Sequence, residues 1–301
     1  MTGATRGIGR VAVDRLAAAV PDAHLVLLGR NPGVAALSDD LGARGHPVSW
    51  LETDLLDLGS VRRATGELRT RLAARQLPPL RTVVANAGMQ FTSARTETAD
   101  GFEATFAVNV LANHVLVRRL EDCFAVPSRI VVTVSDTHFG DFKHNLGMVP
   151  APRWRDPELL ARTGAFPRPG TAAAGRTAYS TSKLAAIHLV HEHARRLPAG
   201  VDIVAYNPAF VPGTDLARDA NAAARFAMRR VLPVLTRTPF ATGMAAAGGY
   251  LADVALGRIA APTGSYVDRG QVSRSAAASY DAVRELRLWD ALERLTAPFL
   301  R

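Results

Sequence analysis

Apolar and polar positions along this chain fall into blocks that predict strands and helices in turn. Apolar residues recur at helical spacing from Gly7 to Val20 and again from Phe102 to Leu120. Short continuous apolar runs, which are typical of buried parallel strands, are HLVLLGRN (24–31), PVSWLETD (47–54), RTVVANAG (81–88) and RIVVTVS (129–135). The first half of the chain therefore alternates between the two kinds of element.

The same alternation continues toward the carboxyl end. Further helices are predicted over 34–44, 60–75 (with Ser60 as N-cap), 179–196, about 215–234, 241–256 and 282–295, and further strands over 201–206 and 264–268. Strands that alternate with helices imply right-handed crossovers and a parallel sheet covered on both faces. We expect one doubly wound α/β domain over residues 1–301, with a Pro-, Gly- and Arg-rich insertion at about 137–174 and a helical tail from about 270.

Composition narrows the class of protein. A chain of 301 residues, 48% of them hydrophobic, can bury a large core without staples, and its one cysteine, Cys123, forms no internal disulfide. The net charge is +9, but the arginines are scattered, so we expect no nucleic-acid partner. No apolar run reaches the roughly 18 residues of a membrane span. The first residues also lack the basic segment followed by an apolar segment that is typical of a signal peptide. We expect a soluble, cytoplasmic protein.

The stretch TGATRGIG places three glycines, Gly3, Gly7 and Gly9, at the start of the first predicted helix. Glycines let the backbone approach a pyrophosphate, and a helix N-terminus offers free N–H groups and a positive dipole end. The pattern G-x-x-x-G-x-G differs from the commonest dinucleotide fingerprint but uses the same physics. It predicts a nucleotide-binding turn.

Two arginines indicate which dinucleotide fits. Arg30 ends the first strand-like run, where an acidic residue would bind the ribose 2′-hydroxyl of NAD, and Arg6 lies inside the glycine turn. Arginine suits a 2′-phosphate, so the sequence favours NADP(H) over NAD(H). Asp54 is a candidate for the adenine amino group, and the small residues of ANAG (85–88) leave room for a ligand.

The segment YSTSK carries the strongest chemical signal, because Tyr179 and Lys183 share one face of a helix. An ammonium group favours the phenolate, so we expect Lys183 to lower the pKa of Tyr179 and make it a usable acid and base. Lys183 is one of only two lysines, the other being Lys143. Ser135 ends a strand and can donate to a carbonyl oxygen. Asn109 lies mid-helix, where it is either structural or holds a water that relays protons to Lys183.

Other residues with metal-binding or nucleophilic side chains are set aside. His188, His191 and His193 do not share one helix face, so we interpret them as ordinary helix histidines and predict no metal site. Cys123 is interpreted as a packing residue. The chain lacks the G-x-S-x-G elbow of serine hydrolases.

Taken together, TGATRGIG, Asp54, ANAG, Asn109, Ser135, YSTSK and NPAFVPGT (207–214) follow the order and spacing of the short-chain dehydrogenase/reductase family, which this sequence resembles over most of its length. The SDTH stretch (135–138), its distance of about 40 residues from Tyr179, and GRN (29–31) resemble the retinol dehydrogenase and protochlorophyllide reductase branch.

The resemblance implies a Rossmann-like fold with a parallel sheet, and hydride transfer with a nicotinamide cofactor. It implies a catalytic tetrad of Asn109, Ser135, Tyr179 and Lys183. The cofactor-binding residues that it implies are Gly3, Thr5, Arg6, Gly7, Ile8, Gly9, Arg30, Asp54, Leu55, Asn86, Ala87, Gly88, Tyr179, Lys183, Pro208, Val211 and Thr214.

The chain departs from the family at its first residue. In the family a central strand precedes the glycine turn, and here that first strand is missing. Met1 stands where the family usually has Val, and a GTG codon read as a start gives Met, so we expect a longer natural product.

The function expected is the NADP(H)-dependent interconversion of a carbonyl and an alcohol. Phe139, Phe142, Met148 and Trp154 in the insertion favour a bulky, apolar substrate. Two alternatives remain open: a non-catalytic NADP(H)-binding protein, and a reductase of C=C bonds on the same scaffold. The protein is expected to be a monomer or a homodimer.

Overall fold

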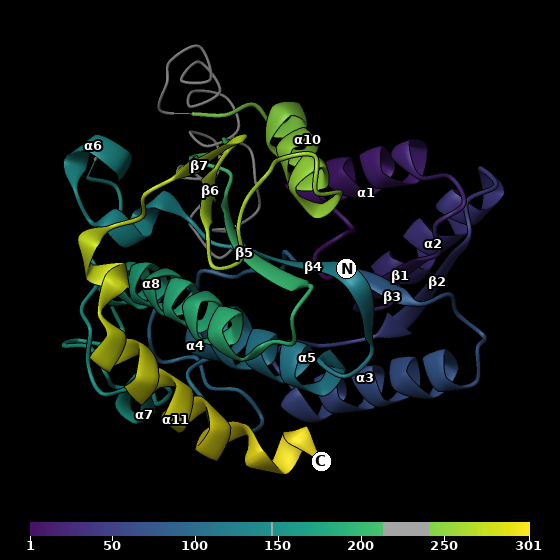
Figure 1. The fold of residues 1–301 in the computed structure, drawn as a ribbon. Coiled ribbons are helices and arrows are strands. Elements are labelled where there is room, and N and C mark those ends of the chain that lie inside the picture. Colours follow the sequence, from purple (N-terminus) through teal and green to yellow (C-terminus); the bar gives the residue numbers. More distant parts are fainter. Residues whose placement is uncertain (146, 213–240) are drawn as a thin grey trace.

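The computed structural model describes residues 1–145, 147–212 and 241–301 (Figure 1). Its parallel strands are β1 (Leu25–Gly29), β2 (Val48–Glu52), β3 (Leu80–Ala85), β4 (Phe124–Thr133), β5 (Val201–Asn207) and β6 (Tyr266–Asp268), and β7 (Gln271–Ser273) is antiparallel to β6. Hydrogen bonds join them in the orders β1–β2 and β3–β4–β5–β6–β7. The predicted doubly wound α/β fold is confirmed.

Helices cover both faces of these strands. They are α1 (Gly7–Ala19), α2 (Gly33–Ala43), α3 (Leu58–Ala73), α4 (Ala104–Phe106), α5 (Ala112–Leu120), α6 (Phe142–Asn145), α7 (Pro157–Leu160), α8 (Ala172–Arg196), α10 (Met244–Ala255) and α11 (Ala282–Leu300). In Figure 1, α1 and α10 pack together on one side of the strands, while α3, α5 and α8 lie on the other. The helix α11 forms an outer layer against α8 and α5.

Several element boundaries differ from the sequence expectation. The helix α8 begins seven residues before Tyr179, because the Thr171 hydroxyl caps it by accepting a hydrogen bond from Ala174 N at 3.3 Å. The predicted N-cap Ser60 is wrong: Asp57 caps α3 and accepts from Ser60 N at 3.0 Å. The helix predicted over 102–120 contains a π-helical segment, Ala107–Leu111, between α4 and α5. The helix expected at about 215–234 lies outside the described residues.

The predicted insertion, 137–174, contains a 3-10 turn (Asp136–Phe139), α6 and α7. Its aromatic side chains do not gather in one place. Phe139 stacks on His144, with ring centroids 3.7 Å apart, and Trp154 meets the His188 ring edge-on at 4.8 Å. Phe142 is exposed. Phe139 and Trp154 therefore contribute to packing.

The amino end lies between β1 and β3 and joins them through two residues. Met1 N donates to Val26 O at 2.7 Å, Leu28 N donates to Met1 O at 2.8 Å, and Thr2 N donates to Val84 O at 2.9 Å. Thr2 forms isolated parallel bridges with both strands, and among the described residues no strand fills this position.

A cavity of about 380 Å³ opens beside this junction. Apolar side chains of α1, β1, α3, β3 and α5 line it, Leu16, Leu27, Leu68, Val83 and Leu116 among them. Burial lowers the pKa of the Met1 amino group to about 5. Met1 is among the residues that line this cavity.

Candidate active site

The predicted site residues follow the carboxyl ends of the parallel strands. Arg30 follows β1, Asp54 lies beyond β2, residues 86–88 follow β3, Ser135 lies beyond β4, and Pro208 follows β5. Carboxyl ends of parallel strands meet at one edge of a sheet, and open α/β sheets bind ligands there. The structure therefore gathers at one edge residues that are far apart in the sequence.

The glycine turn is tightly built. Gly3 and Gly7 have φ of +65° and +57°, a region that favours glycine. A Cβ on Gly9 would lie 1.9 Å from Gly3 O, so this position admits glycine alone. Asn86 Nδ2 also donates to Gly3 O at 3.1 Å, which fixes the turn to the end of β3.

The first turn of α1 fits an anion. Its N-cap, Arg6, makes no side-chain cap bond to the helix amides, and no acidic residue lies in the first turn. Among the described residues, no heavy atom lies within 4 Å of a Cβ placed on Gly7. First-turn amides and a positive helix end suit a pyrophosphate. Ile8 lies in this first turn, and Thr5 lies close to Gly33.

Arg30 and Asp54 lie together at the ends of β1 and β2. Arg30 Nη1 is 3.9 Å from Asp54 Oδ2, and both side chains are largely exposed. Asp54 is held in place because its Oδ1 accepts from Leu56 N at 3.1 Å and its own N donates to Ser60 Oγ at 3.0 Å. Leu55, the residue after Asp54, is partly buried and packs against the core. The pair can contact the adenosine end of a dinucleotide that begins at the glycine turn.

Tyr179, Ser135 and Lys183 are brought together beneath this edge. Tyr179 and Lys183 are buried, each 3% exposed, and the Lys183 ammonium lies 5.7 Å from the centre of the Tyr179 ring. Its Nζ donates to Thr133 O at 2.9 Å, at the end of β4. The Ser135 hydroxyl lies close enough to the phenol to stabilise its anion.

The expected pKa shift of Tyr179 is not what the structure gives. Burial raises the pKa of Tyr179, Ser135 opposes this, and the charge of Asp136 adds to it. Lys183 is not among the groups that shift this pKa; its Nζ donates to Thr133 O and lies 5.7 Å from the centre of the Tyr179 ring. Burial also lowers the pKa of Lys183 to about 8. In the protein alone, desolvation outweighs the expected effect of the ammonium.

Asn109 lies in the π-helical segment, and both hydrogens of its amide group are used. Its Nδ2 donates to Met89 O and to Ser182 Oγ, both at 2.9 Å, and its Oδ1 accepts from Met89 N at 3.0 Å. A Cβ on Gly88 would lie 3.2 Å from Lys183 Nζ and 3.3 Å from Asn109 Oδ1, so both side chains face this glycine. The structural role of Asn109 is evident, and the water relay stays a prediction.

The loop after β5 completes the edge. Asn207 Oδ1 accepts from Ala209 N at 3.1 Å, and its Nδ2 donates to Asp268 Oδ1 at 3.0 Å. Pro208 lies in this loop, and Val211 beyond it is buried. Thr214, also predicted to bind cofactor, lies outside the described residues.

Sequence reasoning missed two polar residues beside Ser135. Asp136 is only 7% exposed, and its Oδ1 accepts from Ser135 Oγ at 3.3 Å. The ring of His138 bonds to Ser135 O at 2.6 Å through Nδ1 and accepts from Ala276 N at 3.1 Å through Nε2. Their signal was the SDTH stretch, but a stretch of letters does not reveal burial.

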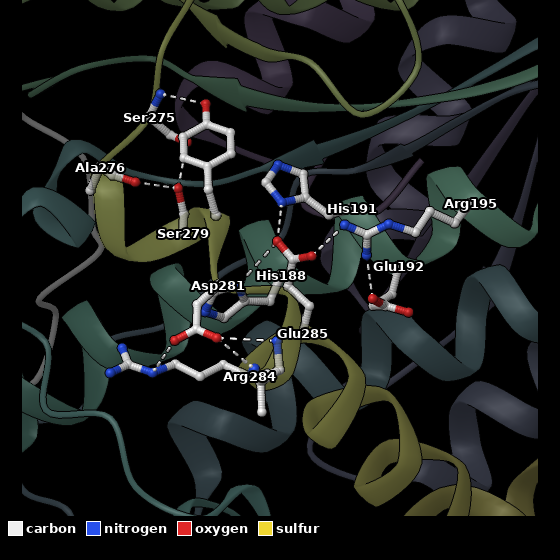
Figure 2. A network of polar contacts seen from close by, with 12 residues as sticks. His188, His191, Glu192, Arg195, Ser275, Ala276, Ser279, Asp281, Arg284 and Glu285 are labelled. Carbon is white, nitrogen blue, oxygen red and sulfur yellow. Dashed lines mark hydrogen bonds and ion pairs between the residues drawn. The ribbon is translucent and has the colours of Figure 1, made fainter.

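The helix that carries Tyr179 and Lys183 is fixed from behind by α11 (Figure 2). Glu285 of α11 is 1% exposed and contacts His191 Nδ1 at 2.6 Å and Arg195 Nη2 at 2.5 Å, both on α8. Burial would raise the pKa of Glu285, but hydrogen bonds from His188, His191 and Arg195 outweigh it and lower that pKa to about 2. Two of the three helix histidines therefore belong to an interhelical ion-pair network.

A doubly wound sheet, a glycine turn at a helix start and a buried Tyr–Lys pair define the class of Rossmann-like nucleotide-binding proteins. The sequence pattern of the family described as short chain dehydrogenase matches residues 1–145. The chain belongs to the short-chain dehydrogenase/reductase family and is an oxidoreductase of that family.

The relatives bear this out over nearly the whole chain. DnrU of Streptomyces sp. (strain C5), provisionally named a daunorubicin C-13 ketoreductase, is 34% identical over 298 residues, which cover 97% of this chain and 89% of DnrU. The human WW domain-containing oxidoreductase is 31% identical over 212 residues, 69% of this chain and 47% of that protein.

Solved structures show the same fold. A short chain dehydrogenase from Burkholderia cenocepacia in complex with NADP superposes with a TM-score of 0.60 at 24% identity, covering 90% of this chain and 95% of the other. A blue fluorescent protein from a metagenomic library, in complex with NADPH, gives 0.59 at 25% identity, over 89% and 95%. In the part of the chain that the structure describes, no helix is long and apolar enough to cross a membrane.

Proposed function

We propose that this protein interconverts a carbonyl compound and its alcohol with NADP(H), and that Tyr179 is the acid and base. One observation carries the proposal: the Tyr179 phenol is buried next to the Ser135 hydroxyl and the Lys183 ammonium, at the sheet edge where the glycine turn also lies. Reduction of a carbonyl requires groups that polarise its oxygen and give that oxygen a proton, and these side chains can do both.

Each side chain has a separate task. The bound nicotinamide supplies or takes the hydride. Ser135 donates a hydrogen bond to the carbonyl oxygen and polarises it. Tyr179 gives that oxygen its proton, and takes the proton back in the reverse direction. Lys183, with its pKa lowered to about 8, is the cation nearest the phenol and the group through which a replacement proton passes.

The cofactor preference follows from Arg30. Its guanidinium stands exposed after β1, 3.9 Å from Asp54, at the strand end where this kind of fold holds the ribose of the cofactor. The neighbours crystallised with NADP and NADPH support the same choice. Arg30→Asp should weaken NADPH binding by tenfold or more, by about 1.4 kcal/mol per tenfold, and leave NADH binding unchanged or tighter. Equal loss for both cofactors would contradict the preference.

The substrate is proposed to be a ketone of substantial size. DnrU is named for reduction of the C-13 ketone of daunorubicin, which has at least thirteen numbered carbon atoms by that name. A panel of acetophenone, cyclohexanone, benzaldehyde and daunorubicin, followed by NADPH consumption and by product analysis, tests the proposal. Reduction of at least one carbonyl supports it. Consumption of NADPH on an enone with only the C=C bond reduced would replace it, and NADPH binding with no turnover on any compound would refute it.

Tyr179→Phe separates binding from catalysis. It removes one hydroxyl from a buried ring and retains the packing, so NADPH affinity should stay within twofold while kcat falls by at least a hundredfold. Tyr250→Phe, on a partly exposed ring of α10, is the matched control and should keep full activity. An active Tyr179→Phe enzyme would remove Tyr179 from the mechanism.

A further inference from the structure

We propose that Asp136 decides where the Ser135 hydroxyl donates its hydrogen, and that it thereby controls whether Ser135 can stabilise the reacting oxygen. The inference rests on the proposed function, because it concerns the same hydroxyl. Asp136 acts through Ser135 and touches no reacting atom, so it is a positioning residue.

The contact between the two side chains carries the argument. Ser135 Oγ donates to Asp136 Oδ1 at 3.3 Å and accepts from Thr137 N at 3.3 Å. A serine hydroxyl has one hydrogen and two lone pairs. With its hydrogen given to Asp136 and one lone pair given to Thr137, Ser135 has one lone pair left, and the Tyr179 hydroxyl is the neighbouring donor that can use it.

That arrangement withholds the Ser135 hydrogen from the reacting oxygen in both directions. An alcohol hydroxyl has one hydrogen, which passes to Tyr179 during oxidation, so its oxygen needs the Ser135 hydrogen as negative charge develops on it. A carbonyl oxygen only accepts, so it needs the Ser135 hydrogen, which an ionised Asp136 holds. Protonation of Asp136 removes the strong acceptor, and the Ser135 hydrogen can then turn to the carbonyl oxygen.

The surroundings of Asp136 allow both protonation states near neutrality. Burial raises the pKa of Asp136 to about 7; the Ser135 hydroxyl and Arg269 oppose this, and the charge of Asp268 adds to it. Tyr179 of α8 and Tyr266 of β6 also face the carboxyl group, and each is held neutral by burial. Of the described residues, Asp268 and Arg269 bring the charges that bear on Asp136.

The test is a pair of pH profiles on the most rapidly reduced ketone of the panel and its alcohol. In the wild type, kcat/KM for reduction should fall about tenfold between pH 6 and pH 8. A tenfold fall corresponds to the free energy of one hydrogen bond to the charge that develops on the oxygen. Asp136→Asn keeps the shape and removes the titration, so its reduction rate should not fall across that range. Asp141→Asn, on an exposed carboxylate that pairs with His144, is the matched control and should keep the wild-type profile. An Asp136→Asn profile with the same fall at the same midpoint would overturn the proposal.

A second variant leaves Asp136 in place. Asp268→Asn removes the charge that raises the pKa of Asp136, so the midpoint of the wild-type fall should move by about half a pH unit or more toward acid. A midpoint that does not move counts against Asp136, even where Asp136→Asn fails to fold.

A double-mutant cycle tests the route through Ser135. Ser135→Ala and Ser135→Ala/Asp136→Asn should show the same pH dependence, because Asp136 has lost the group it acts on. A further effect of Asp136→Asn in the Ser135→Ala background would overturn the positioning role. If the wild type reduces no carbonyl of the panel, the proposed function falls and this inference with it; if it turns over but the profiles are insensitive to Asp136, the inference alone falls.

Discussion

Lys183→Met should make the protein without cofactor more stable while abolishing its turnover. Lys183 is 3% exposed, and the structure gives its ammonium one hydrogen bond, to Thr133 O. An ammonium in such a place costs free energy, because burial removes its hydration. Methionine has nearly the same length and no charge, so it can occupy the same space without that cost.

The magnitude follows from the pKa. Burial takes the pKa of Lys183 from 10.5 to about 8, a drop of about 2.5 units, and each unit is worth about 1.36 kcal/mol. The cost of the buried ammonium is therefore about 3 kcal/mol. The variant also loses the hydrogen bond to Thr133 O, which lowers its stability by about 1 kcal/mol. The net gain of Lys183→Met is about 2 kcal/mol at pH 7, or about 4 °C in Tm for a domain of this size.

The pH dependence gives the gain a signature. Below pH 8 both the folded and the unfolded chain hold the Lys183 proton, so the cost is fully present. Between pH 8 and pH 10.5 the folded chain releases the proton and the unfolded chain keeps it, so wild-type stability rises relative to the variant. The advantage of Lys183→Met should therefore shrink as the pH rises from 8 toward 10.5.

Thermal unfolding of both proteins at pH 7 and at pH 9.5, without cofactor, measures this. Lys143→Met changes the other lysine, which is exposed on α6, and should leave Tm within about 1 °C. A Lys183→Met protein that is less stable than the wild type at pH 7, or an advantage that does not shrink at pH 9.5, would refute the reasoning.

Two other substitutions test the turn and the rear support of the site. Gly9→Ala should lower NADPH affinity by at least tenfold, since its Cβ would lie 1.9 Å from Gly3 O. Gly249→Ala is the control, because its Cβ would meet nothing within 4 Å. A titration of NADPH fluorescence measures both variants, and equal affinities would contradict the close packing of the turn. Glu285→Gln should cost about 3 kcal/mol in urea unfolding at pH 7, because it leaves His191 without its anion and Arg195 with Glu192 alone. The pKa of Glu285 is held at about 2, so its contribution is complete above pH 4.5 and is lost as the pH falls toward 2; the deficit of Glu285→Gln should narrow over that range, and a constant deficit would show that the charge is not responsible.

Local sequence patterns predicted the elements that carry the site. The run RIVVTVS gave β4 and the position of Ser135 beyond its end, because a β-branched apolar run is typical of a strand buried on both faces. The four-residue spacing of Tyr179 and Lys183 is likewise a property of one helix. Boundaries set by caps were less predictable: Thr171 and Asp57, rather than Tyr179 and Ser60, mark where α8 and α3 begin.

What the sequence did not reveal depends on tertiary contacts. Glu285 lies 94 residues from His191, and nothing in either neighbourhood signals that they meet. The burial of Asp136 depends on β6, and the direction of the Lys183 ammonium depends on Thr133 O. The pKa expected for Tyr179 was wrong for this reason, since a spacing rule contains the neighbouring charge but not the loss of water around the phenol.

The two-residue junction at the amino end has a mechanical consequence. Met1 and Thr2 join the strand pair β1–β2 to the strands β3 to β7, and a cavity lies beside this junction. A dinucleotide that reaches from Arg30, after β1, to Ser135, after β4, would cross this junction. Its binding would then connect the end of β1 with the end of β4, and amide hydrogens of both strands should exchange more slowly when the cofactor is added.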